Sequence, residues 1–150
     1  MPAGVWCMKA STAPRHRGRF TCQPLLDRLA EKIHAPAVTE SRLPGFGFDE
    51  TAHWMWAGAL SKKRCGGRRP IIKIDESTNL VVGVLRIMLS LLDGVPLSER
   101  DGMHACHAEG CDIPLCVNPF HAYWGTPEQN RRDRHTRQPH SFLRKDKRPC

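Results

Sequence analysis

The sequence predicts a small α+β domain stabilised by zinc. Cys106, Cys111, Cys116 and His121 follow one another at intervals of five residues, and four such groups can close a tetrahedral zinc site. The chain has 150 residues with 12 glycines and 12 prolines, and only 40% of it is hydrophobic. This composition leaves a thin core, to which a bound metal would add folding free energy. Apolar residues recur at helical spacing in some segments and in short strand-like runs in others.

The first 50 residues are predicted to form an N-terminal arm and one helix. Residues 1–20 contain Pro, Ser, Thr and basic residues, which is typical of an arm. A helix is expected over about 23–34, because Pro24 suits a first turn and Leu25, Leu29 and Ile33 share one face. Residues 35–50 are expected to be a connector.

A hairpin and a second helix should follow. The aromatic run 53–60 and the apolar run 70–74 are expected to pair across a basic turn at 61–69. Trp54 and Trp56 lie on one face of the first strand and are expected in the core.

The second helix is expected over about 80–92, with Asn79 as its N-cap and Asp93-Gly94 as its end. Its apolar stripe is predicted to be core: Leu80, Val84, Ile87, Met88 and Leu91.

The cysteine motif is followed by a third helix. Thr126 is a good N-cap and Pro127 a good first residue, so a helix is expected over about 127–136. The pattern is then strand, loop and helix, with His104 on the strand and Asn130 in the first turn of the helix. Residues 51–136 are predicted to be the main domain, and residues 137–150 a basic tail.

The charge distribution predicts a polyanionic partner. The net charge is +8, and residues 131–150 hold eight Arg and Lys against two Asp. Such a segment typically binds nucleic acid. The residues expected to contact it are Arg131, Arg132, Arg134, Arg137, Arg144, Lys145, Lys147 and Arg148.

The cysteine count indicates a reducing compartment. Seven cysteines cannot all pair within one chain, and clustered cysteines in a reducing compartment more often bind metal than form disulfides. No apolar run is long enough to cross a bilayer, and no signal peptide is recognisable. An intracellular location is therefore expected, in the cytoplasm of a host cell or in a eukaryotic nucleus.

Several motifs together resemble the HNH endonucleases, in the phage-type subgroup related to His-Cys box homing enzymes. The resemblance covers roughly residues 52–134. It rests on Cys111-Asp-Ile-Pro-Leu-Cys116-Val-Asn-Pro-Phe-His121, Trp124-Gly-Thr126, Asn130-Arg-Arg-Asp133 and the upstream His53-Trp54-x-Trp56-x-Gly58-Ala59.

The resemblance implies a ββα-metal nuclease core whose partner is double-stranded DNA and which hydrolyses its phosphodiester bonds. It also implies a structural Zn²⁺, held by His53 (where the family commonly has Cys), Cys116, His121 and either Cys106 or Cys111. A catalytic Mg²⁺, or another divalent cation, would be bound through Asn130. One active site cuts one strand, so cleavage of both strands would favour either a homodimer or two sequential events.

The catalytic base depends on which cysteine is the first zinc ligand. If Cys106 is the first, the base position falls on His104 and residues 107–111 are an insertion. If Cys111 is the first, the match has no gap and the base position falls on Glu109. His104 is the predicted base, because imidazole titrates near neutral pH and can take a proton from water. His107 is the second choice.

Two other functions are compatible with the same residues. One is a zinc-stabilised nucleic-acid-binding module, a degenerate nuclease that no longer cuts. The other is an interaction protein in which zinc only fixes the fold, and the basic tail argues against it. A self-contained zinc site of Cys106, Cys111, Cys116 and His121 is also possible, and it would leave His53 out.

Overall fold

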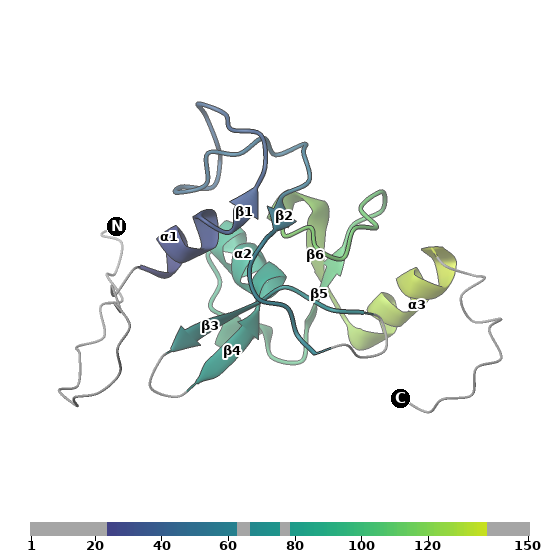
Figure 1. The fold of residues 1–150 in the computed structure, drawn as a ribbon. Helices are drawn as coiled ribbons and strands as arrows, with labels where there is room; N and C mark the ends of the chain where they lie inside the picture. The colour runs from purple at the N-terminus through teal and green to yellow at the C-terminus, as the bar shows by residue number, and fades with distance from the viewer. Residues whose placement is uncertain (1–23, 63–66, 76–78, 138–150) are drawn as a thin grey trace.

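A computed structural model describes residues 24–62, 67–75 and 79–137. The expected arm (1–20) and the tail beyond residue 137 lie outside the described residues, as do Cys7, Cys22, Cys65 and Cys150. The described part is a small α+β fold of three α-helices and three two-stranded antiparallel sheets. In Figure 1, α1 and α3 lie at opposite ends of the fold, with α2 between them.

The first helix is shorter than predicted. Helix α1 spans Leu25–Ala30, and the next residues form strand β1, Ile33–His34. Strand β1 pairs with β2, Met55–Trp56, so that Ile33 lies opposite Trp56. Each of the two residues is only 5% exposed. The prediction of helix through residue 34 was wrong because the β-branched Ile33 is suited to a strand and is buried there opposite Trp56.

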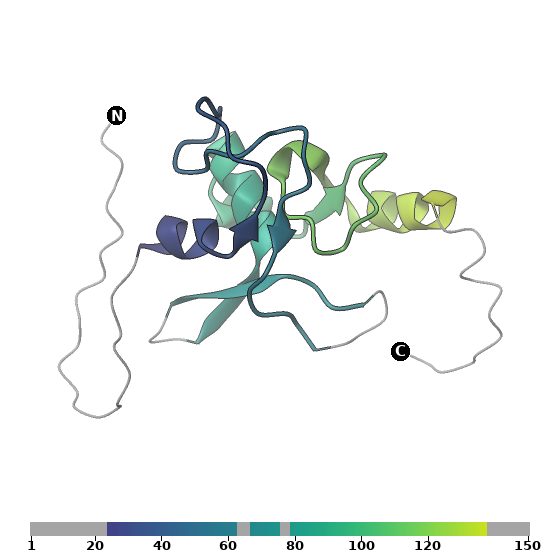
Figure 2. The same ribbon diagram turned by 45° about the horizontal axis from the view of Figure 1, so that its top comes forward.

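The predicted hairpin has a different partner. Strand β3, Ile71–Asp75, pairs with β4, Leu80–Gly83, and not with residues 53–60. The segments expected to pair meet only at an isolated bridge between Leu60 and Pro70. Proline has no N–H to donate to a ladder, which limits pairing at this point. Figure 2 shows the β3–β4 hairpin extending below the rest of the fold.

Helix α2 begins later than predicted, at Val84, and ends at Asp93. Asn79 is not its N-cap, because Asn79 lies in the preceding turn with a φ of 54° and residue 83 occupies the cap position. The end at Gly94, with a φ of 69°, is as predicted.

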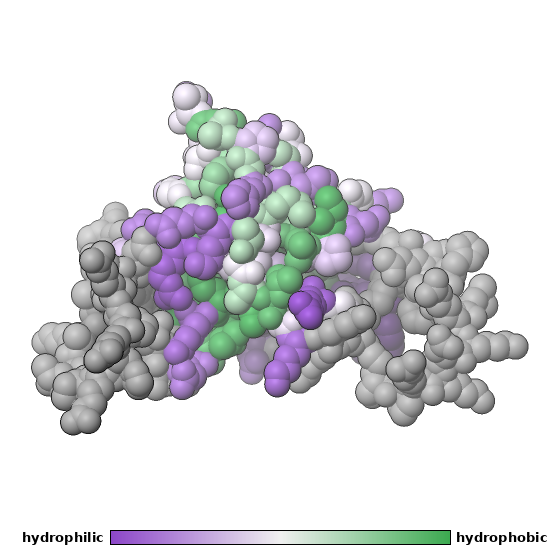
Figure 3. Space-filling model, viewed as in Figure 1, coloured by the Kyte–Doolittle hydropathy of each residue, from purple (hydrophilic) through white to green (hydrophobic). Residues whose placement is uncertain are grey.

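The apolar stripe of the second helix is only partly core. Val84, Ile87 and Met88 are buried, but Leu80 is 51% exposed in β4 and Leu91 is 36% exposed. Green atoms gather over the β3–β4 hairpin in Figure 3, where Leu80 and Val81 are half-exposed.

The motif region forms a β-hairpin followed by a helix. Strand β5, His104–His107, pairs with β6, Ala122–Gly125, and α3 runs over Pro127–Arg137. Strand β6 therefore lies between the loop and α3. The pattern of strand, loop and helix that was predicted from the residues did not include this second strand. Thr126 caps α3 as predicted: its hydroxyl accepts from the Gln129 N–H, and the Gln129 side chain accepts from the Thr126 N–H.

One core joins α1, α2 and the strands β1 to β4 with the loop between β5 and β6. It includes Leu29 and Phe46 from the first 50 residues together with Trp54, Met88 and Val117 from later ones. Both predicted core tryptophans are buried, with Trp54 at 0% and Trp56 at 5% exposure. In the part of the chain described here, no helix has the length and apolarity needed to cross a membrane.

Candidate metal cluster and histidine-lined cavity

Four of the predicted zinc ligands lie together. The ligand atoms of His53, Cys111, Cys116 and His121 are all within 4.8 Å of one another. Three come from the loop between β5 and β6, and His53 comes from the segment just before β2. The group could therefore hold a metal ion and join two distant parts of the chain.

The distances within this cluster fit a tetrahedral zinc site. With Zn–S about 2.3 Å and Zn–N about 2.0–2.1 Å, a thiolate sulfur and an imidazole nitrogen lie about 3.6 Å apart. Sγ of Cys111 is 3.6 Å from Nδ1 of His53, and Sγ of Cys116 is 3.8 Å from Nδ1 of His121. The two pairs are thus already at the spacing that one central ion requires.

Burial shifts the protonation of two groups in this cluster. Burial, and then the neighbouring Cys116, raises the pKa of the Cys111 thiol to about 11. Burial, and then the charge of His53, lowers the pKa of His121 and favours its neutral form, which binds metal. A metal ion would replace the thiol proton and remove the cost of burying a thiolate.

Cys106 is not part of the cluster. It is buried in β5 opposite Tyr123, and its Sγ lies 3.6 Å from the carbonyl oxygen of His104. A Cβ on Gly125 would come within 3.0 Å of that sulfur, so Cys106 fills the space next to this glycine. Of the two alternatives left open by the sequence, the structure groups Cys111 with the other three residues, while Cys106 lies apart from them in β5.

Asn118 fixes the approach of His53. Its side chain is fully buried, and its amide donates to the carbonyl oxygens of Glu50 at 2.8 Å and Ala52 at 2.7 Å. Its oxygen accepts from the Phe120 N–H. Asn118 therefore ties the residue before His53 to the loop that carries the other three ligands.

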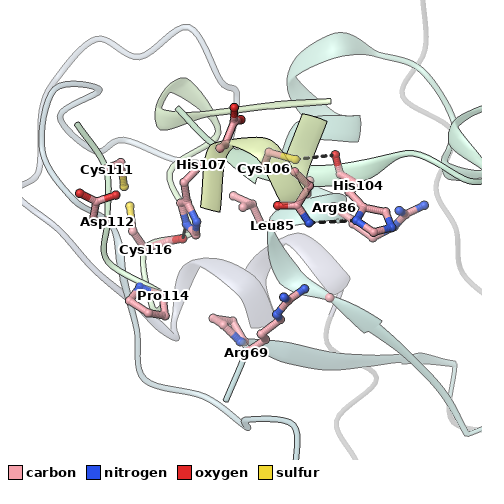
Figure 4. Close-up of a pocket in the computed structure, with 15 residues that line it drawn as sticks. Arg69, Leu85, Arg86, His104, Cys106, His107, Cys111, Asp112, Pro114 and Cys116 are labelled. Carbon is pink, nitrogen blue, oxygen red and sulfur yellow. Dashed lines mark hydrogen bonds between the residues drawn. The ribbon is translucent and has the colours of Figure 1, made fainter. Parts of the chain in front are cut away.

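A cavity of about 360 Å³ lies beside the cluster. Figure 4 shows side chains from β5, α2 and the segment before β3 around it. Its polar lining consists of Arg69, Arg86, His104, Cys106, His107, Cys111, Asp112, Cys116, Asn130 and Asp133. The predicted base, the second-choice base and the predicted Mg²⁺ ligand thus line one cavity.

His104 contacts Asn130 directly. His104 is exposed on β5, and its Nδ1 lies 3.0 Å from Nδ2 of Asn130 on α3. Nδ1 of His104 accepts this amide N–H, so the proton of the neutral ring is on Nε2. The same bond turns the amide oxygen of Asn130 away from the histidine.

His107 is bonded through its other ring nitrogen, Nε2. Its Nε2 lies 2.9 Å from the carbonyl oxygen of Cys116, and the ring is half-buried. A carbonyl can only accept, so Nε2 carries the proton and Nδ1 keeps the lone pair. Because Cys116 belongs to the metal cluster, the loop that could hold the metal also sets the tautomer of His107.

The remaining predicted residues lie around this cavity or outside the described residues. Arg131 and Arg132 are exposed on α3, and Arg134 and Arg137 lie on the same helix. Glu109, the base position in the gap-free alignment, is exposed in the loop and does not line the cavity. Arg144, Lys145, Lys147 and Arg148 lie outside the described residues.

Sequence reasoning did not identify three residues of this region. Arg69 and Arg86 line the cavity, and Asn118 is the fully buried tether. The basic turn at 61–69 was a signal for Arg69. Arg86 carried none, because one arginine on an otherwise apolar helix is typical of a solvated face.

No protein-family model matches the chain, and no curated protein or solved structure is significantly similar to it.

Proposed function

We propose that this protein is a metal-dependent DNA endonuclease of the HNH type, with a ββα-metal core made of β5, β6 and α3. The observation that carries the proposal is the single cavity shared by His104, His107 and Asn130 next to a four-ligand His/Cys cluster. Strand, ligand loop, strand and helix follow one another in the order that the sequence resemblance implies.

The zinc in this proposal is structural. Four protein ligands would complete its coordination, leaving no position for substrate. Its role is to hold the loop against β2 and, through the carbonyl of Cys116, to hold His107.

We assign the general base to His107, the second choice from sequence. Hydrolysis requires a group that removes a proton from the attacking water. Nδ1 of His107 keeps a lone pair, since Nε2 is the nitrogen bonded to the Cys116 carbonyl. In His104 the lone pair of Nδ1 is already used by the Asn130 amide, and Nε2 carries the proton. His104 therefore positions Asn130 and does not take the proton.

Asn130 is the proposed ligand of the catalytic cation. Its amide oxygen is the kind of ligand that Mg²⁺ accepts, and the bond to His104 orients that oxygen. The bound cation would supply stabilisation of the charge that develops on the phosphate and leaving oxygen. The exposed Arg69, on the same cavity wall, is suited to a phosphate of the substrate.

DNA is the proposed substrate because the chain carries a net charge of +8 and α3 begins at the cavity. Arg131 and Arg132 are exposed one and two residues after Asn130, where they can contact phosphates. Such contacts give affinity without sequence choice, and we expect binding to weaken steeply with salt.

The test is nicking of a supercoiled plasmid with Mg²⁺. His107→Ala should slow nicking by about 10²–10⁴-fold, the usual contribution of a general base. His104→Ala and Asn130→Ala should mainly raise the Mg²⁺ concentration that nicking requires. His34→Ala, an exposed histidine in β1, is the matched control and should cut normally.

Each other outcome has a definite meaning. Loss of nicking in His104→Ala with normal nicking in His107→Ala would return the base to His104. A native protein that binds DNA but does not nick it with Mg²⁺ or Mn²⁺ would be the binding module. A native protein that does neither would contradict the proposal entirely.

A further inference from the structure

We infer that Arg86 is a positioning residue that, through His104, orients the amide of Asn130 toward the catalytic cation. This inference rests on the proposed function, because it takes Asn130 as the cation ligand. It concerns a group of side chains between α2 and the β5–β6 hairpin.

Arg86 holds the chain directly before His104. Its guanidinium donates to the carbonyl oxygen of Met103, and to that of Arg100 at 3.2 Å. Met103 precedes His104 in the sequence, and Arg86 itself lines the cavity. Because a guanidinium is planar and has several fixed donors, these two bonds hold the start of β5 in one orientation.

The same guanidinium also contacts the neighbouring strand. Its central carbon lies 5.2 Å from the ring centroid of Trp124, and that of Arg100 lies 5.8 Å from the same ring. The indole N–H donates to the carboxylate of Asp93 at 2.7 Å. Trp124 is thus held by two cations and one hydrogen bond.

Trp124 lies opposite Ala105 in the hairpin. Arg86 therefore acts on both neighbours of His104: it bonds the carbonyl of residue 103, and it stacks on the partner of residue 105. Since His104 in turn bonds the Asn130 amide at 3.0 Å, the order of contacts runs from α2 through β5 to α3.

A direct role of Arg86 in binding phosphate is less favoured. Its donors already face two backbone carbonyls, whereas Arg69 is exposed on the same cavity. Residues that orient a metal ligand from behind typically change metal affinity by about 10–100-fold when they are replaced. The expected effect of losing Arg86 is therefore a higher requirement for the cation.

The experiment compares Arg86→Gln with Arg28→Gln. Arg28 is the matched control, because its guanidinium also donates to a backbone carbonyl, that of Lys73 at 2.7 Å, but it does not line the cavity. The first readout is the Mg²⁺ concentration for half-maximal nicking at saturating DNA. The second is paramagnetic broadening of the Asn130 side-chain amide by Mn²⁺, followed by NMR without DNA.

In Arg86→Gln, both readouts should require roughly tenfold more cation. The rate at saturating Mg²⁺ and the KM for DNA should stay near the native values, and Arg28→Gln should match the native protein. Arg86→Lys should remain impaired, because an ammonium cannot reproduce both carbonyl bonds and the stacking. If Arg86→Gln does not fold, Trp124→Phe tests the same contacts, and it should raise the cation requirement by a smaller factor.

Three results would overturn the inference. The first is a higher KM for DNA with an unchanged Mg²⁺ requirement, which would make Arg86 a phosphate contact. The second is full rescue by Arg86→Lys, and the third is equal behaviour of Arg86→Gln and Arg28→Gln. If the native protein does not nick DNA, the proposed function fails, but the NMR measurement still tests the role of Arg86. Broadening of the Asn130 amide that needs more Mn²⁺ in Arg86→Gln than in the native protein supports the inference. An Asn130 amide that Mn²⁺ does not broaden in the native protein refutes it.

Discussion

The metal cluster and the histidine-lined cavity share the loop between β5 and β6, but they are built differently. The cluster joins segments almost 60 residues apart in sequence, from His53 to Cys111, and both of its thiols are buried. The cavity takes its histidines from one short strand, and one of them is exposed. The first arrangement connects the chain and should govern stability, whereas the second presents groups to solvent and should govern chemistry.

The largest effect should come from removing a ligand of the cluster. Cys111→Ser should lose bound zinc and several kcal/mol of stability, because a structural zinc supplies about 10–16 kcal/mol of binding free energy in small zinc-dependent folds. Cys106→Ser is the matched control, a buried thiol outside the cluster, and should keep its zinc and lose only about 1–2 kcal/mol. Zinc stoichiometry and Tm measure both variants. Equal losses would restore Cys106 as a ligand.

A smaller effect is expected at Asn118, which ties the segment before His53 to the loop between β5 and β6. Asn118→Ala removes three hydrogen bonds of a fully buried side chain, and should cost about 2–4 kcal/mol. It should also weaken zinc binding, since His53 is no longer held. Asn118→Asp keeps the acceptor for the Phe120 N–H but lacks both donors, and should also be destabilised. An Asp variant as stable as the native protein, measured by urea unfolding, would show that the donors contribute nothing.

The smallest effect should appear in the dependence on pH. The pKa of Cys111 in the folded, metal-free protein is raised from 9.0 to about 11. A raised pKa gives stability that is present below pH 9 and is lost as the pH rises toward 11. Zinc affinity depends on pH in the opposite direction. The bound cysteine is a thiolate, so binding releases a proton and becomes stronger as the pH rises. Urea unfolding of the metal-free protein above and below pH 9 measures the first dependence, and zinc titrations between pH 6 and 8 measure the second. A metal-free protein that gains stability above pH 9 would contradict the raised pKa of Cys111.

Local sequence signals predicted much of the site. The five-residue spacing of Cys111, Cys116 and His121 predicted three cluster residues, and the cap at Thr126 predicted the helix that carries Asn130. These features depend on spacing and capping within a few residues, which a sequence displays directly.

The missed features depend on contacts between distant segments. Pairing of Ile33 with Trp56 shortened the first helix, and the role of Cys106 was decided by its position opposite Tyr123. The orientation of the two histidines was equally hidden, because it depends on which carbonyl or amide lies beside each ring. Neither spacing nor residue type indicates that His107 would meet the carbonyl of Cys116.

The loop that carries three of the cluster ligands is closed at its base. The N–H of Ala108 donates to the carbonyl of His121 at 2.7 Å, and a turn then returns from Ala108 to Cys111 with Gly110 at a φ of 88°. The stretch between the strand and the first ligand is thus an exposed turn whose ends are fixed. The path from the end of β5 to Cys111 is therefore set by the backbone bonds of this turn and by Gly110, whereas Cys111, Cys116 and His121 are placed by the cluster that they share with His53. An engineer seeking a place to attach a chemical label should choose Glu109, which is exposed in this turn, and keep the number of residues unchanged.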